Sequence, residues 1–235
     1  MAAGSMVAVL AGENILAPPA VSAAQIFLDP ATIEVAEIVP PPPAADSVAA
    51  QADLEAVLQA QAWRDAEQVE WAKRVAAADF FSLFAEGLLP ADFNRQNCPQ
   101  LVELLRGMSA SCAPVNDAAK KRYARPRPFT VDARVAPCVE RPAGHSYPSG
   151  HAQAAVLWAE VLGELFPTHK MELQARARRI SWGRVLAGVH YPTDLAAGER
   201  LGEALLAEMK KSPAFRARLE KCRNEIAAVG RRKAA

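Results

Sequence analysis

The sequence predicts an all-helical single domain, and three observations lead to this fold class. Ala, Leu, Glu, Gln and Arg, which favour helix, are abundant, whereas runs of β-branched residues are scarce. Apolar residues recur at helical spacing in several segments, and we find no convincing ladder of strands and no internal repeat. The chain has 235 residues, of which 51% are hydrophobic and 23% charged, so it can bury one sizeable core and is globular.

The chain divides into an N-terminal extension (residues 1–45), a helical domain (46–229) and a basic tail (230–235). The extension opens with an apolar stretch that ends in Ala20-Val-Ser-Ala23, a sequence similar to a signal-peptidase site. Because a positive n-region is missing, we interpret Met1 to about Ala24 as the remnant or replacement of an export signal. Residues 25–45 are proline-rich and predict a polyproline II arm that lies on the domain; an arm wrapping a partner subunit, and hence a homo-oligomer, stays open.

Capping residues and prolines mark the expected helices. Asp46-Ser47 begins the first, Cys98-Pro99 begins a later one, and Asn116-Asp117 is expected to cap a separate short helix that carries Lys120. Arg125 to Pro128 must run extended, because proline cannot continue a helix. The other helices are expected at about residues 66–76, 79–86, 150–166, 170–189, 192–211 and 213–229.

Charge is unevenly distributed along the chain. No Lys or Arg precedes Arg64, while that stretch holds seven acidic residues, so the remainder carries +8 if the whole carries +1. An anionic substrate would therefore find its counter-charges in the C-terminal two-thirds. The small net charge offers no global field for nucleic acid, and no apolar stretch reaches the length of an integral membrane segment. The four cysteines fit either two disulfides or four buried thiols.

Three short segments contain residues suited to phosphoryl transfer. In Pro148-Ser149-Gly150-His151, Ser149 is placed to cap a helix whose free backbone N–H groups form an anion site, and Gly150 lets a ligand approach. His151 follows in the first turn. An ordinary serine cap beside a surface histidine is the simpler alternative for this segment alone.

The second segment supplies cations. Lys120 offers a point charge, and Arg127 offers a planar fork that matches two phosphate oxygens. The stiff Arg-Pro-Arg-Pro sequence would hold Arg127 with little loss of entropy. Taken alone, the segment is more typical of a basic surface loop.

The third segment runs from Arg184 to Asp194. His190 is expected to end one helix, and Pro192 to begin the next, which places Asp194 in its first turn. An ionised Asp194 bonded to one imidazole nitrogen of His190 would leave the other nitrogen as a nucleophile. A helix–helix turn with a capping Asp and a buried His is the alternative.

A metal site is the competing interpretation of the same residues. His151, His190, Asp194 and also His145 are metal-binding residue types. The cations supplied by the same segments would repel a metal ion, so we expect no metal and no cofactor.

Together the three segments resemble the signature of the phosphatidic-acid-phosphatase type 2 superfamily: Lys-x6-Arg-Pro, Pro-Ser-Gly-His and Ser-Arg-x5-His-x3-Asp. The match covers Lys120 to Asp194. Within the superfamily the chain is most similar to the bacterial class A non-specific acid phosphatases, through Arg125-Pro-Arg-Pro-Phe129, Ser146-Tyr-Pro-Ser-Gly-His151 and the Pro40–Pro43 run. It departs from the signature at Gly183, where the pattern has Ser, so one phosphate contact could be weaker.

The resemblance implies a helical fold, a metal-independent reaction on small phosphate monoesters, and a periplasmic or secreted location. It implies that His190 attacks phosphorus, that Asp194 supports it, and that His151 protonates the leaving alcohol. It further implies a set of phosphate-binding residues: Lys120, Arg127, Ser149, Gly150 and Arg184.

Other functions remain open from the sequence. A vanadium-dependent haloperoxidase would hold vanadate in a similar anion site, and a lipid phosphate phosphatase would act on dispersed lipid phosphates. A phosphate-binding module would bind without turnover. A phosphoenzyme could also be intercepted by alcohols or nucleosides, which predicts phosphotransferase activity.

Overall fold

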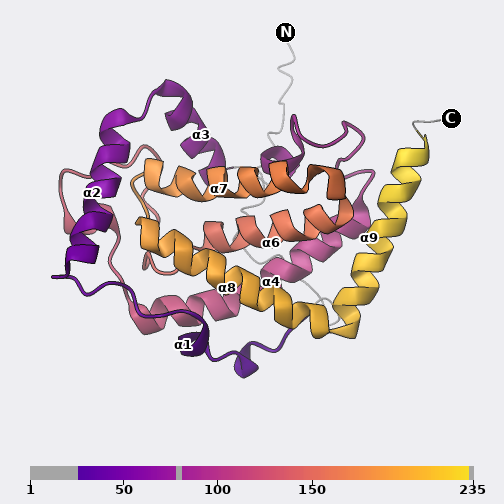
Figure 1. The fold of residues 1–235 in the computed structure, drawn as a ribbon, viewed down its shortest axis with the longest axis horizontal. Helices are drawn as coiled ribbons and strands as arrows, with labels where there is room; N and C mark the ends of the chain where they lie inside the picture. The colour runs from indigo at the N-terminus through magenta and orange to yellow at the C-terminus, as the bar shows by residue number, and fades with distance from the viewer. Residues whose placement is uncertain (1–25, 78–80, 233–235) are drawn as a thin grey trace, which may run out of the picture.

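The computed structural model describes residues 26–77 and 81–232, and its regular elements are all helices (Figure 1), which confirms the predicted class. The apolar N-terminus that we interpreted as an export-signal remnant lies outside the described residues. No described helix has the length and hydropathy needed to cross a membrane. The α-helices are α1 (Val35–Ile38), α2 (Val48–Trp63), α3 (Ala66–Ala77), α4 (Pro99–Tyr123), α5 (Pro128–Val131), α6 (Gly150–Leu165), α7 (Lys170–Leu186), α8 (Pro192–Lys211) and α9 (Pro213–Arg232). The other helical turns are two 3-10 turns, η2 (Pro30–Thr32) and η4 (Pro167–His169), and one π-helical turn, η3 (Phe81–Ala85).

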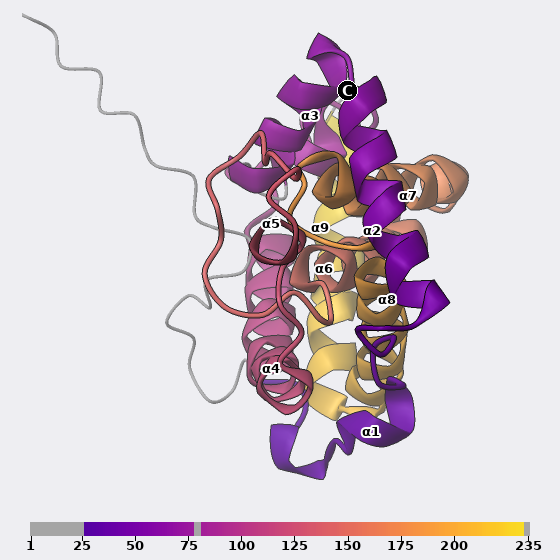
Figure 2. The ribbon, with the colours of Figure 1, turned by 90° about the vertical axis from the view of Figure 1, so that its left-hand side faces the viewer.

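Helix α6 is the centre of the bundle. It is buried along most of its length and packs against α7, α8, α4 and α9. Helix α9 lies at one end of this group, and α2 and α3 lie at the other, where α3 packs on α7 (Figures 1 and 2).

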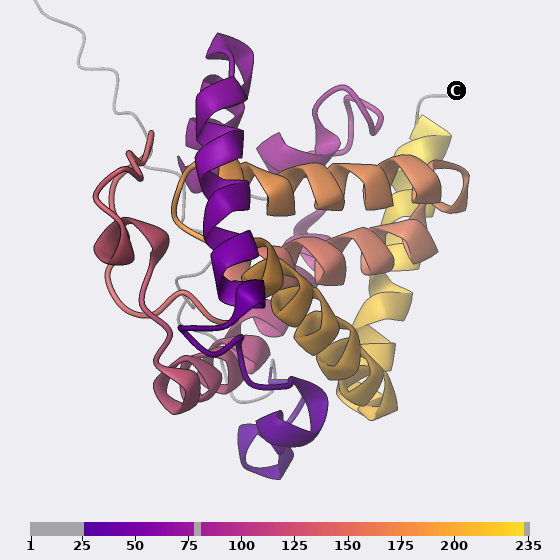
Figure 3. The ribbon, with the colours of Figure 1, turned by 60° about the vertical axis from the view of Figure 1, so that its left-hand side comes forward.

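The connections bring three helix ends to one place. A tight turn at Pro167 reverses the chain between α6 and α7, and a short segment (187–191) reverses it again before α8. The start of α6, the end of α7 and the start of α8 therefore share one end of the bundle. Helix α2 crosses this end and contacts both α7 and α8 (Figure 3).

Two glycines of α8 allow it to lie directly on α6. A Cβ atom at Gly198 would overlap the carbonyl oxygen of Ser149, and one at Gly202 would lie 2.8 Å from the carbonyl oxygen of Gln153. Because these neighbours are backbone atoms, a larger residue would push the two helices apart. The glycines thus fix the distance between the start of α6 and the start of α8.

Three expected helix boundaries were wrong. No separate short helix begins at Asn116, because α4 continues through Pro114 to Tyr123. The Asn116 amide does not cap a helix but donates to the Gln153 side-chain oxygen at 2.6 Å on α6, inside the core. Helix α7 ends at Leu186 instead of Val189, so His190 lies in the connecting segment, and α9 extends to Arg232, into the expected tail.

The proline-rich arm lies on the domain, as predicted. Val39 is fully buried, the Tyr123 hydroxyl donates to its carbonyl oxygen at 2.5 Å, and the Tyr147 hydroxyl donates to the Pro40 carbonyl oxygen at 2.6 Å. The arm is not one continuous polyproline II segment, however, because η2 and α1 interrupt it. Asp29 and Glu34 cap these two turns through their carboxylates, which favours the helical turns locally.

The four cysteines are unpaired, which contradicts the alternative of two disulfides. Cys98, Cys112 and Cys222 are buried thiols, whereas Cys138 is only half-buried. Burial raises the pKa of the Cys112 thiol to about 12 and that of Cys98 to about 11. Both thiols are therefore protonated and unreactive at neutral pH.

Candidate active site

The first wall of the site is the beginning of α6. The Ser149 hydroxyl oxygen caps the helix by accepting from the Ala152 N–H at 3.4 Å, as the sequence predicted. Gly150 and His151 occupy the first turn and are buried. The N–H groups of such a first turn have no acceptor within the helix, so an anion placed here would receive them.

Carbonyl oxygens of two segments, the loop before α6 and the connection between α7 and α8, hold two cations in place. Arg127 donates to the carbonyl oxygens of Val189 at 2.9 Å and Gly144 at 3.1 Å. The Lys120 ammonium donates to the carbonyl oxygens of His145 at 2.9 Å and Pro148 at 2.8 Å. Both side chains are thus fixed beside the start of α6 before any ligand binds.

Arg184 supplies a third cation, from the last turn of α7. It is only 3% exposed, and its Nε and one terminal nitrogen have no hydrogen-bond partner within the described residues. The Nε2 atom of His151, 8% exposed, also has none there. Buried polar atoms without partners are costly, so the clustering of these donors and the imidazole nitrogen marks a place built to receive an anion.

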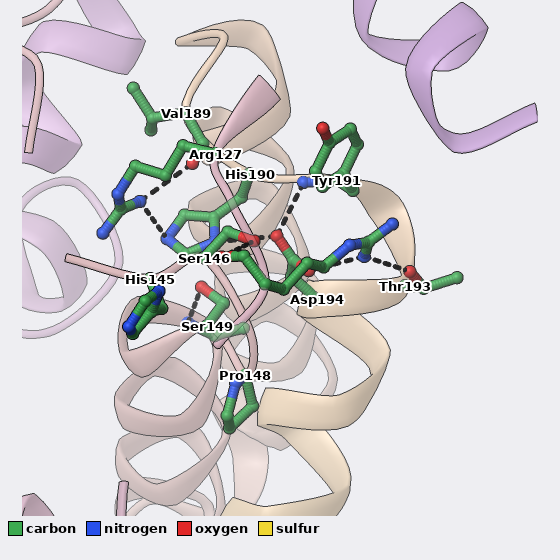
Figure 4. Close-up of polar contacts among 12 residues, drawn as sticks. Arg127, His145, Ser146, Pro148, Ser149, Val189, His190, Tyr191, Thr193 and Asp194 are labelled. Carbon is green, nitrogen blue, oxygen red and sulfur yellow. Dashed lines mark hydrogen bonds and ion pairs between the residues drawn. The ribbon is translucent and has the colours of Figure 1, made fainter. Parts of the chain in front are cut away.

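His190 lies between a carboxylate and a guanidinium (Figure 4). Its Nδ1 is 3.1 Å from Asp194 Oδ2, and its Nε2 is 3.3 Å from an Arg127 terminal nitrogen. The carboxylate fixes the tautomer, because only an Nδ1–H can donate to it and Arg127 can only donate to Nε2. The Nε2 lone pair is therefore directed toward the cations.

Burial and positive charge shift the pKa values of the site in one direction. Burial, and then Lys120 and Arg127, lower the pKa of His190 well below its usual value. Burial and Arg184 do the same to His151. Both imidazoles are neutral at neutral pH in the empty site, and a bound dianion would raise the pKa of each.

The cations also lower one another's pKa values. Burial and Arg127 lower the pKa of Lys120 to about 8 and that of Arg184 to about 10. Burial raises the pKa of the Asp194 carboxyl, and the Arg125 guanidinium opposes that shift. An anion of two charges would relieve the repulsion among the three cations.

The structure brings all the predicted site residues together at one end of the bundle, although their roles stay predictions. His145 contributes its backbone carbonyl oxygen to Lys120. Among the described residues, no group of three or more His, Cys, Asp or Glu side chains is arranged to hold a metal ion.

Two charged residues of the site were missed by the sequence reasoning. Arg125 donates to Asp194 Oδ1 at 2.7 Å and to Asp53 Oδ2 at 2.8 Å. The Arg-Pro-Arg-Pro sequence contains both arginines, but our sequence prediction assigns a role only to Arg127. Nothing in the sequence marked Asp53, which looks like one more polar residue of an alanine-rich helix.

Gly183 faces away from the expected phosphate contact. A Cβ atom there would lie 3.3 Å from both Trp71 Nε1 and Val75 Cγ2 on α3. The absence of a side chain therefore lets α3 pack closely on α7.

We expect the Gly183→Ser substitution to leave the KM for a phosphate monoester within about threefold of the wild-type value, because the new side chain meets α3. The close contacts should lower the free energy of unfolding by about 1 kcal/mol. Steady-state kinetics and thermal unfolding would measure both, with Gly198→Ser as the disruptive comparison. A KM lowered tenfold would mean that the new hydroxyl reaches the phosphate after all.

Anion binding should weaken as Lys120 loses its proton. With a pKa of about 8, its ammonium is charged below that pH and neutral above it. Sulfate keeps its charge between pH 7 and about 9.5, so its own titration does not affect the result. Over this range, the constant for its competitive inhibition of substrate turnover should rise severalfold. A constant that stays flat over this range would show that Lys120 does not contribute charge to the site.

Comparisons with known proteins identify relatives of this chain. Residues 101–218 match the sequence profile of the PAP2 superfamily. The chain is 30% identical to a non-specific acid phosphatase of Salmonella typhimurium over 195 residues, which covers 80% of this chain and 78% of the relative. It is 27% identical to a non-specific acid phosphatase of Providencia stuartii, covering 83% and 82% of the two chains.

Solved structures of lower identity share the fold. A transmembrane PAP2 type phosphatidylglycerolphosphate phosphatase from Bacillus subtilis aligns with a TM-score of 0.50 at 22% identity, over 71% of this chain and 87% of that one. A bacterial vanadium-dependent iodoperoxidase aligns with a TM-score of 0.53 at 18% identity, over 90% of this chain and 62% of that one. At these identities the likeness concerns the helical fold alone.

Proposed function

The chain belongs to the PAP2 superfamily, and on this premise we propose that it is a metal-independent acid phosphatase. It hydrolyses phosphate monoesters with broad substrate specificity, through a phosphohistidine intermediate. The observation that carries this proposal is the buried cluster of three cations beside two neutral histidines, with donors that lack acceptors within the described residues.

Substrate binding begins with the phosphoryl group. Its oxygens accept hydrogen bonds from the side chains of Lys120, Arg127 and Arg184, from the Ser149 hydroxyl and from the Gly150 amide. The bound negative charge raises the pKa of His151, so this imidazole takes up a proton when the substrate binds. The cations that kept His151 neutral in the empty site are then compensated.

In the first chemical step, the His190 Nε2 lone pair attacks phosphorus. A P–N bond forms, the P–O bond to the organic group breaks, and His151 donates its proton to the departing alkoxide. Asp194 stabilises the positive charge that develops on the His190 ring. The Arg127 guanidinium, 3.3 Å from His190 Nε2, opposes protonation of that nitrogen, so the ring stays neutral and nucleophilic.

In the second step, water attacks phosphorus while neutral His151 accepts its proton. The P–N bond breaks, phosphate is released, and His190 returns to its neutral form. An alcohol or a nucleoside hydroxyl in place of water would receive the phosphoryl group, so phosphotransferase activity is part of the proposal.

We also propose a periplasmic or secreted location. The apolar N-terminal stretch that ends in Ala20-Val-Ser-Ala23 supports this, since it is similar to an export signal. Expression of the chain as given, followed by fractionation into cytoplasm, periplasm and medium, would test it.

The function is tested by hydrolysis of p-nitrophenyl phosphate from pH 4 to 8, with and without EDTA, and with added vanadate. We expect activity that survives EDTA and is inhibited by vanadate, a tetrahedral oxyanion. Activity lost to EDTA would contradict the metal-independent reaction. Bromide oxidation with vanadate and peroxide, in the absence of hydrolysis, would identify a haloperoxidase instead.

A further inference from the structure

We propose that Asp53 and Arg125 act as a positioning pair that holds the Asp194 carboxylate in the orientation His190 requires. The inference rests on the proposed function for its kinetic consequences. It adds helix α2 to the working parts of the site, although α2 precedes the residues that match the superfamily profile.

Arg125 bridges two carboxylates with one guanidinium. One terminal nitrogen donates to Asp194 Oδ1 at 2.7 Å, and the other donates to Asp53 Oδ2 at 2.8 Å. The central carbon of the guanidinium also lies over the Tyr191 ring, 4.0 Å from its centroid. A lysine could not make this arrangement, because its ammonium is a single point charge.

The pairing accounts for both oxygens of Asp194. Oδ1 accepts from Arg125, while Oδ2 accepts from the Tyr191 N–H at 2.9 Å and lies 3.1 Å from His190 Nδ1 (Figure 4). Rotation of the carboxylate would break the bond to Arg125 as well as that to His190. The guanidinium therefore sets the angle at which Asp194 meets the imidazole.

Asp53 also binds the start of α8 directly, through Thr193. Its Oδ1 accepts from the Thr193 N–H at 3.2 Å, and its Oδ2 accepts from the Thr193 hydroxyl. Thr193 directly precedes Asp194 in the first turn of α8 (Figure 4). Asp53 thus fixes both the side chain that grips Asp194 and the backbone that carries it.

Burial makes the arrangement stringent. Asp53, Arg125 and Asp194 are 4%, 8% and 0% exposed, so each charge depends on its partners. Glu55, two residues from Asp53 on the same helix, is exposed and offers a matched control for charge removal.

The test is a double-mutant cycle of Asp53→Asn and Arg125→Gln, with Glu55→Gln as control. We expect Asp53→Asn to lower kcat about 10- to 100-fold while KM stays within about twofold, because a misplaced nucleophile slows chemistry more than binding. In the Arg125→Gln background, Asp53→Asn should have little further effect, since the pair acts as a unit. Equal factors in both backgrounds, or a kcat like that of Glu55→Gln, would overturn the proposal.

Two further measurements keep the test decisive. Should Asp53→Asn not fold, Arg125→Lys retains the cation but cannot bridge both carboxylates; we expect a lowered kcat, and a wild-type kcat would refute the pairing. The ¹⁵N resonances of His190, assigned by their loss in His190→Ala, should shift in Asp53→Asn and not in Glu55→Gln. This readout needs no turnover, so a wild-type protein without phosphatase activity would contradict the proposed function while the positioning pair is still tested.

Discussion

Replacing His190 with alanine is expected to lower kcat by about 10⁴-fold or more. The contact of Nδ1 with Asp194 leaves the lone pair of His190 on Nε2. The contact of Nε2 with Arg127 shows that this lone pair is directed toward the cations. Without it, water would have to attack the phosphate ester directly. Phosphate binding should survive, because the three cations remain, so sulfate should still bind to the variant.

The matched control is His169→Ala, which removes a histidine from η4 at the other end of α6 and should leave kcat unchanged. Steady-state hydrolysis of p-nitrophenyl phosphate measures the effect. Turnover of His190→Ala near the wild-type rate would refute its role as the nucleophile.

Replacing His151 with alanine should reduce activity by an amount that depends on the leaving group. An alkoxide is a poor leaving group without a proton, so we expect alkyl phosphates to slow by about 10²- to 10⁴-fold. Nitrophenolate leaves readily without a proton, so p-nitrophenyl phosphate should be affected much less. A series of esters with leaving groups of graded pKa would measure this as a steeper dependence of rate on leaving-group pKa in the variant.

An equal loss for all esters would show that His151 is not the general acid. The buried position of its ring, beside Arg184 and with Nε2 lacking a described partner, is what leads us to expect the selective loss.

The sequence was sufficient to predict the parts of the site that local rules determine. The Ser149 cap, Pro192 at the start of α8 and Asp194 in its first turn all follow from short-range preferences of helix ends. The pairing of His190 with Asp194 follows as well, since His190 lies four residues before Asp194, just outside the helix whose first turn contains Asp194.

Long-range packing explains what was missed. Asp53 meets Arg125 and Thr193 only because α2 crosses the end of the bundle, and no local signal encodes that crossing. Likewise, Asn116 has the side chain of a helix cap, but its amide finds a buried partner in Gln153, and α4 continues through it. Gly198 lies in an ordinary helical stretch of the sequence, and only the packing of α8 on α6 brings it against the Ser149 backbone.

The central claim is the covalent intermediate on His190, and mass spectrometry of the trapped protein tests it most directly. The wild-type enzyme would be mixed with p-nitrophenyl phosphate, quenched in alkali, where phosphohistidine is stable, and digested. The account predicts one phosphoryl group on His190 and none in the Asp194→Asn or His190→Ala variants. A phosphoryl group on another residue of an active enzyme would contradict it.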